Sequence, residues 1–125
     1  MSDDGLAAVQ YEYAAVVPAG SLLFTAGACP IDASGRVVAV GDHSAQAEKA
    51  TDNLLAVMDR YQIGAEHLVK ATIYVVGTRD ALVAVWNVVS ARLKPHRPPA
   101  TLLGVSVLGY PDQLVEIDAI AALPR

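Results

Sequence analysis

LVEIDAIA, residues 114–121, is the stretch that decides the fold. Its apolar and polar side chains alternate with a period of two, which predicts a half-buried β-strand. On such a strand Glu116 and Asp118 point to the same face, about 7 Å apart. A carboxylate in so apolar a strand is solvated at an oligomer edge, paired with another group, or functional. The alternation leaves these interpretations open, and Glu116 is the stronger pocket candidate because it lies nearer the strand centre.

The sequence patterns on the N-terminal side of this stretch predict further strands and two helices. Helices are expected at residues 44–62, where apolar residues recur every three or four positions, and from Thr78 to the helix-stopping Pro95. The expected strands are residues 7–17, 21–26, 36–40, 68–76, 101–107 and 113–123. The order β-β-β-α-β-α-β-β predicts a two-layer α+β fold, with both helices on one face of a mixed sheet.

Local signals mark the helix ends. Asp42 or Ser44 can cap the first helix, and Gly64 suits the left-handed position just past its end. Thr78 is expected to cap the second helix. Because the helices cover only one face of the sheet, we expect further copies of the chain to cover the other face.

Composition and charge exclude several classes of protein. The 125 residues suit one domain spanning 1–125, and no apolar run approaches the length of a membrane-spanning helix. Residues 1–5 are too acidic and polar for a secretory signal. The formal net charge is −4 and the nine Lys and Arg residues are scattered, which disfavours binding to nucleic acid. A single cysteine, Cys29, suits a reducing compartment, so a cytoplasmic location is expected.

No metal or nucleophile motif stands out. His43, His67 and His96 lie 24 and 29 residues apart, without the pairing of a metal site, so cap or surface roles are expected. Cys29 has no adjacent base, which favours a packed thiol.

Side chains from other strands could complete a pocket around Glu116. Lys70, Thr72 and Tyr74 share one face of their strand, so any of them could partner the carboxylate. Tyr13 in the first strand could offer its phenol to a ligand, although packing explains this tyrosine equally well.

Several motifs fall in the order of a known family. Tyr13 and Gly20 precede LLFTAGACPID at 22–32, and the first helix carries Gln46 and TDNL at 51–54. LVKATIYV at 68–75 and LVEIDAIA at 114–121 complete the pattern over nearly the whole chain. In these motifs the sequence resembles the RidA/YjgF/YER057c/UK114 family, whose members are also called L-PSP endoribonuclease-like proteins.

The resemblance implies a chorismate-mutase-like fold and a homotrimer. In this family three sheets line a central barrel, and small-molecule clefts lie at the subunit interfaces. The best-known activity is hydrolysis of imines and enamines such as 2-aminoacrylate, without a metal or organic cofactor. Other members have been described as ribonucleases or translation inhibitors.

The chain departs from the family pattern at the expected site. Residues 98–101 read PPAT, so Thr101 stands where the deaminases carry an arginine that clamps the substrate carboxylate. Glu116, fifteen residues later, matches the carboxylate that helps to position water, and Tyr13 also matches. The positions that usually hold serine, asparagine and cysteine hold Ala26, Trp86 and Leu103.

The missing arginine changes the expected ligand. Arginine fits a planar carboxylate better than any other side chain, so its loss should lower kcat/KM by at least about tenfold to a hundredfold. Arg97 could swing into the cleft in its place, or it could remain an exposed loop residue. We therefore expect a less anionic, more apolar ligand seated against Trp86, Leu103 and Thr101.

Three functions remain open from the sequence. The favoured one is a trimer that binds a small metabolite between subunits and possesses altered specificity, with Glu116 as the catalytic group if it hydrolyses an imine or enamine. The second is a module that binds a ligand or a protein without catalysis. The weakest is an endoribonuclease, because the chain is acidic and has no basic stripe.

Overall fold

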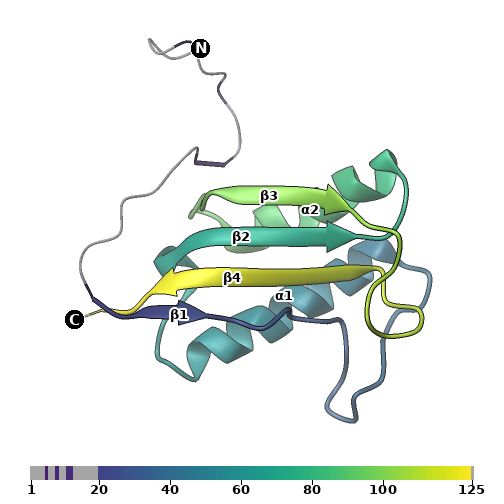
Figure 1. The fold of residues 1–125 in the computed structure, drawn as a ribbon, viewed down its shortest axis with the longest axis horizontal. Helices are drawn as coiled ribbons and strands as arrows, with labels where there is room; N and C mark the ends of the chain where they lie inside the picture. Colours follow the sequence, from purple (N-terminus) through teal and green to yellow (C-terminus); the bar gives the residue numbers. More distant parts are fainter. Residues whose placement is uncertain (1–4, 6–7, 9–10, 13–19, 125) are drawn as a thin grey trace.

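A computed structural model describes residues 5, 8, 11–12 and 20–124. The elements in chain order are β1 (Leu22–Phe24), α1 (His43–Asp59), the short 3-10 helix η1 (Ala65–His67), β2 (Leu68–Val75), α2 (Arg79–Leu93), β3 (Ala100–Gly104) and β4 (Val115–Ala122). The strands form one sheet in the order β1-β4-β2-β3, and both helices lie behind it in Figure 1. The predicted α+β fold is confirmed.

The stretch that decides the fold is an inner strand of the sheet. β4 runs antiparallel to β1 and β2, while β2 and β3 run parallel, so the sheet is mixed as expected. The odd-numbered residues from Val115 to Ala121 are buried against the helices and form part of the core. Glu116 and Asp118 are half-buried and belong to the opposite face, as the alternation predicts.

The predicted caps are largely confirmed. The Asp42 side chain accepts a hydrogen bond from the backbone of Ala45, and Thr78 accepts one from Ala81. These bonds satisfy amide groups that have no partner inside the helix.

The prediction for Gly64 is wrong. Gly64 is extended, with φ −124°, and Gln62 takes the left-handed position instead, with φ 60°. The amide of Gln62 donates to the carbonyl of Asp59, and the amide of Ile63 donates to that of Met58. This bond pattern is a Schellman motif, in which the first residue past the helix cap must be left-handed.

Two expected strands differ from the prediction. Most of residues 7–17 lies outside the described residues. The strand expected at 36–40 is a single bridge between Ile31 and Val37. It stops there because Ala39 has φ 52°, a left-handed conformation that cannot continue a strand.

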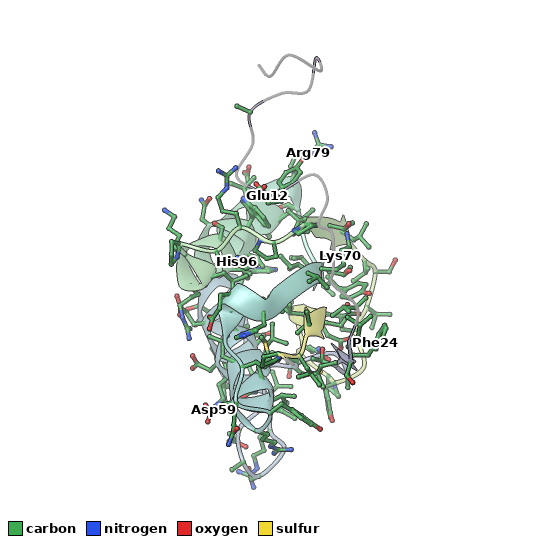
Figure 2. The ribbon with its side chains drawn as sticks, turned by 90° about the vertical axis from the view of Figure 1, so that its left-hand side faces the viewer. Glu12, Phe24, Asp59, Lys70, Arg79 and His96 are labelled. Carbon is green, nitrogen blue, oxygen red and sulfur yellow. The ribbon has the colours of Figure 1, made fainter. Side chains whose placement is uncertain are left out.

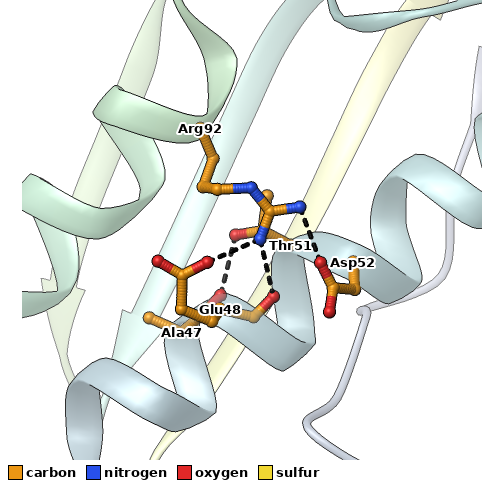
Figure 3. Close-up of polar contacts among 5 residues, drawn as sticks. All are labelled: Ala47, Glu48, Thr51, Asp52 and Arg92. Carbon is orange, nitrogen blue, oxygen red and sulfur yellow. Dashed lines mark hydrogen bonds and ion pairs between the residues drawn. The ribbon is translucent and has the colours of Figure 1, made fainter.

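The two helices are joined by an ion-pair cluster on the outer surface (Figure 3). Arg92 of α2 lies 2.7 Å from a carboxylate oxygen of Glu48 and 2.6 Å from one of Asp52, both on α1. All three side chains are partly exposed, so each pair contributes about 1 kcal/mol or less. The cluster therefore fixes the helix orientation more than it adds stability.

Candidate functional site

The face of the sheet turned away from the helices carries a group of polar side chains. We call this side of the sheet the open face. Its polar side chains are those of Lys70, Thr72 and Tyr74 of β2, Thr101 of β3, and Glu116 and Asp118 of β4, and the apolar Leu103 of β3 lies beside them. The strand register places Thr72 between Thr101 and Asp118, and Tyr74 between Leu103 and Glu116. Figure 2 shows Lys70 and Phe24 on this side of the molecule.

A β-bulge beside β4 makes room for the candidate catalytic carboxylate. The amide of Thr25 donates to the carbonyl of Ala119 at 3.0 Å, and Ala28 pairs with Ile117. Two residues, at positions 26 and 27, therefore stand opposite the one residue between Ala119 and Ile117. Bulges of this kind re-aim neighbouring side chains and are frequent next to active sites.

Gly27 in this bulge lies directly against the Glu116 carboxyl group. A Cβ at position 27 would overlap the carboxylate and would lie 2.8 Å from Cγ of Glu116. A side chain here would therefore displace the carboxylate.

Two donors fix one oxygen of Glu116. Oε1 accepts a hydrogen bond from Nε2 of Gln113 at 3.1 Å and one from Sγ of Cys29 at 3.3 Å. Gln113 is only 3% exposed, and its own Oε1 accepts from the amide of Tyr110. Among the described residues both donors reach Oε1, which leaves Oε2 to accept a proton.

Cys29 acts as a donor in this arrangement. Burial raises the pKa of its thiol to about 11, and the hydrogen bond to Glu116 and the charge of that carboxylate act in the same direction. The thiol is therefore protonated at neutral pH. Asn53 holds this segment in place, because Nδ2 donates to the carbonyls of Cys29 and Ile31 at 2.8 and 2.9 Å.

Asp118, the second carboxylate, is paired. The hydroxyl of Tyr74 donates to Oδ2 of Asp118 at 2.9 Å. That bond, with burial and the charges of both carboxylates, raises the pKa of Tyr74. Asp118 therefore fits the paired role that the sequence left open.

Lys70 lies at the other side of the open face. Its Nζ donates to Oγ1 of Thr101 at 2.6 Å. The ion pairs among the described residues join His67 to Glu66 and Arg92 to two α1 carboxylates, and Lys70 takes part in none of them. Lys70 is thus a half-buried ammonium group bonded to a neutral hydroxyl.

The partner of Glu116 differs from the one expected. None of Lys70, Thr72 and Tyr74 hydrogen-bonds to it; Gln113 and Cys29 do. No sequence pattern singles out Gln113, and the surroundings of Cys29 in the sequence favour a packed thiol. Cys29 and Glu116 are 87 positions apart, so no local pattern connects them.

The remaining site candidates fall into two groups within one copy of the chain. Thr101 and Leu103 share the open face with Glu116, and Ala26 is exposed in the adjoining bulge. Trp86 and Arg97 instead line a cavity of about 370 Å³ between α2 and the β3 edge of the sheet. Tyr13 lies outside the described residues.

The chain passes close to this cavity at residues 11 and 12. The rings of Tyr11 and Trp86 meet edge to face, with centroids 6.2 Å apart. The amide of Glu12 donates to the carbonyl of Arg97 at 3.2 Å. Both contacts place residues 11 and 12 beside Trp86 and Arg97.

The histidines have structural contacts. One nitrogen of each ring lies within hydrogen-bond distance of a backbone group: Val76 for His43, Gly64 for His67 and Leu68 for His96. In the described part of the chain, no three His, Cys, Asp or Glu side chains are grouped as a metal site requires. No helix among the described residues is long and apolar enough to cross a bilayer.

Fold and site together define a class: a small α+β protein with a fixed carboxylate on the open face of a mixed sheet. The model of the family described as endoribonuclease L-PSP matches residues 5–123. The chain therefore belongs to this RidA/YjgF/L-PSP family, as its motifs predict.

Individual relatives agree with this assignment. Protein DfrA of Myxococcus xanthus is 37% identical over 112 residues, covering 89% of this chain and 83% of the relative. A RutC family protein of Pyrococcus horikoshii is 32% identical over 110 residues, covering 87% and 85%. The structure of the Rid-family protein YyfB from Yersinia pestis superposes with a TM-score of 0.85 at 28% identity, covering 91% of this chain and 87% of that one.

Proposed function

We propose that the protein binds a small metabolite on its open face and hydrolyses an imine or enamine, with a specificity that differs from that of arginine-bearing relatives. The observation that carries this proposal is the Glu116 carboxylate, set over Gly27 with Oε1 held by two donors. A carboxylate fixed in this way can orient a water molecule and accept its proton.

The chemistry requires only water and proton transfers. Water attacks the imine carbon as the C=N electron pair moves to nitrogen, and Oε2 of Glu116 accepts a proton from the water and passes it to that nitrogen. In the resulting carbinolamine Glu116 moves the hydroxyl proton to the amino group, which leaves as ammonia while the carbonyl compound forms.

The apolar side chains at the edge of the open face also favour association between copies of the chain. Leu22 and Phe24 of β1 lie at its edge and are 43% and 67% exposed. Exposed apolar side chains beside a group of polar side chains fit a surface that other copies cover. We propose the homotrimer implied by the resemblance, with ligand sites at the subunit boundaries.

Keto-acid release from 2-aminoacrylate generated in situ tests the hydrolase. Glu116→Gln keeps the shape but cannot accept the proton, so turnover should fall by about a hundredfold or more. Gly27→Ala should also lower turnover, because its Cβ displaces the carboxylate. Gly109→Ala is the matched control, since a Cβ there meets nothing within 4 Å. Turnover in Glu116→Gln equal to that of the wild type would refute the catalytic role.

A binding module without catalysis is the second candidate. Thr101 at the position of the clamping arginine favours it, because the family's usual anion contact is absent. In that case small acids should raise the Tm without being consumed, since a ligand stabilises the state that binds it. Turnover that depends on Glu116 would contradict this alternative.

A further inference from the structure

We propose that Gln113 is a positioning residue, which holds the Glu116 carboxylate in the orientation that its chemistry requires. The inference rests on the proposed hydrolysis, in which Glu116 accepts a proton from water. Gln113 touches no reacting atom in that scheme. It acts through Glu116, because a donor fixed on one carboxylate oxygen decides where the other oxygen points.

The side-chain amide of Gln113 has a single favourable orientation. Its Nε2 donates to the carbonyl of Val115 and to Oε1 of Glu116, each at 3.1 Å. Its Oε1 accepts from the amide of Tyr110 at 3.1 Å. A flipped amide would turn its oxygen toward a carbonyl and a carboxylate, and its NH2 group toward an N–H donor. The contacts with Val115 and Tyr110 therefore keep a donor directed at Glu116.

The backbone on both sides of Gln113 is bonded to α1. Oε1 of Gln46, a fully buried side chain, accepts from the amide of Leu114 at 2.8 Å. Nε2 of Gln46 donates to the carbonyl of Asp112 at 3.0 Å. One buried glutamine of the helical layer thus holds the residues before and after Gln113. A site residue needs support of this kind, because its own contacts are only as exact as its mounting.

A turn on the other side completes the support. The backbone amide of Gln113 donates to the carbonyl of Tyr110 at 3.1 Å, while the Gln113 side chain accepts from the amide of Tyr110. Two hydrogen bonds between the same pair of residues close the turn. The side chain of Gln113 therefore leaves a backbone that is fixed by the turn and by α1 together.

Gln113 should contribute more to this positioning than Cys29. An amide N–H is a full hydrogen-bond donor, whereas a thiol S–H is a weak one. Gln113 is also buried, at 3% exposure, while Cys29 is only half-buried. A hydrogen bond is stronger where water does not compete for it. We therefore expect the loss of Gln113 to affect Glu116 more than the loss of Cys29.

Steady-state kinetics test this role, with 2-aminoacrylate generated in situ at a series of rates. Gln113→Met keeps a similar side-chain volume and removes the donor. kcat should fall by about tenfold to a hundredfold, the effect of losing a hydrogen bond to a charged group, while KM changes little. Cys29→Ala should lower kcat less. Gln62→Met is the matched control, because it replaces an exposed glutamine. An unchanged kcat, or a loss confined to KM, would overturn the proposal.

A double variant separates positioning from a general structural role. If Gln113 acts through Glu116, Gln113→Met should cause no further loss of turnover in the Glu116→Gln background, where the carboxylate is already absent. An effect on the stability of the whole protein would instead lower turnover by the same factor in both backgrounds. That result would overturn the positioning role.

The side-chain amide resonances of Gln113 give a readout that does not depend on turnover. Both Nε2 protons are hydrogen-bonded, so they should exchange slowly with water in a spectrum of the isotope-labelled wild type. Glu116→Ala removes one acceptor and keeps Val115, so these resonances should shift and exchange faster. No response would refute the role of Gln113 even if the hydrolase stands. A response in a protein without turnover would refute the hydrolase and support Gln113 as the group that orients Glu116.

Discussion

The thiol of Cys29 makes the stability of the folded protein depend on pH. Its thiol donates to Glu116, and its pKa is raised from 9.0 to about 11. The folded protein therefore keeps a proton that the unfolded chain releases near pH 9. The resulting stabilisation is fully present below that pH and is lost as the pH rises through about 11.

We expect the thiol to stay protonated at pH 8 and to react slowly with iodoacetamide there, because the thiolate is the nucleophile. Thiolate absorbance followed against pH should show its midpoint near 11. Cys29→Ala supplies the blank, since the chain has one cysteine. A midpoint at or below 9 would show that the thiol is neither buried nor bonded to Glu116 in solution.

At the residue scale, the sequence predicts only part of the site. Period-two alternation places Glu116 and Asp118 on one face, because that relation is local to the strand. It does not distinguish the paired Asp118 from the positioned Glu116. Gln113 and Cys29 reach Glu116 through a loop and a bulge, and the geometry of such contacts is set by tertiary packing.

At the element scale, the helices and the long strands follow from periodicity and capping residues. Asp42 and Thr78 cap the helices because their side chains bond amides three residues ahead, within one local segment. The end of α1 could not be predicted from composition, because Gln62 takes a left-handed position that favours glycine.

Gln62 offers a stability test at this scale. Gln62→Gly should stabilise the protein by about 0.5–1 kcal/mol, because glycine adopts a positive φ without steric cost. Urea unfolding measures the difference in the free energy of unfolding. Gln62→Ala keeps a Cβ and should give no such gain. Equal gains from both changes would point to the glutamine side chain instead of the backbone.

At the scale of the whole molecule, the helices cover one face of the sheet and leave the polar group and Phe24 on the other (Figures 1 and 2). Phe24 is 67% exposed. If copies of the chain meet over this face, a charged side chain introduced at position 24 would be desolvated within the interface and would have no partner.

Phe24→Asp should therefore convert the proposed trimer to a monomer of 13.1 kDa, as measured by light scattering during size-exclusion chromatography. Val83→Asp is the matched control, because Val83 of α2 is 52% exposed on the helical layer. Loss of assembly in both variants, or in neither, would place the interface elsewhere.

The bulge at positions 26 and 27 also determines what a change in the length of this segment would do. Pairing on either side of it, at Thr25 with Ala119 and at Ala28 with Ile117, holds both flanks against β4. Losing one residue here would turn the bulge into a regular ladder, because a single residue would then stand opposite Asp118 and both flanks could keep their partners and their faces. The backbone beside the Glu116 carboxylate would change, since Gly27 lies against it. We therefore expect a one-residue deletion at 26–27 to leave the fold intact and to disturb the position of Glu116.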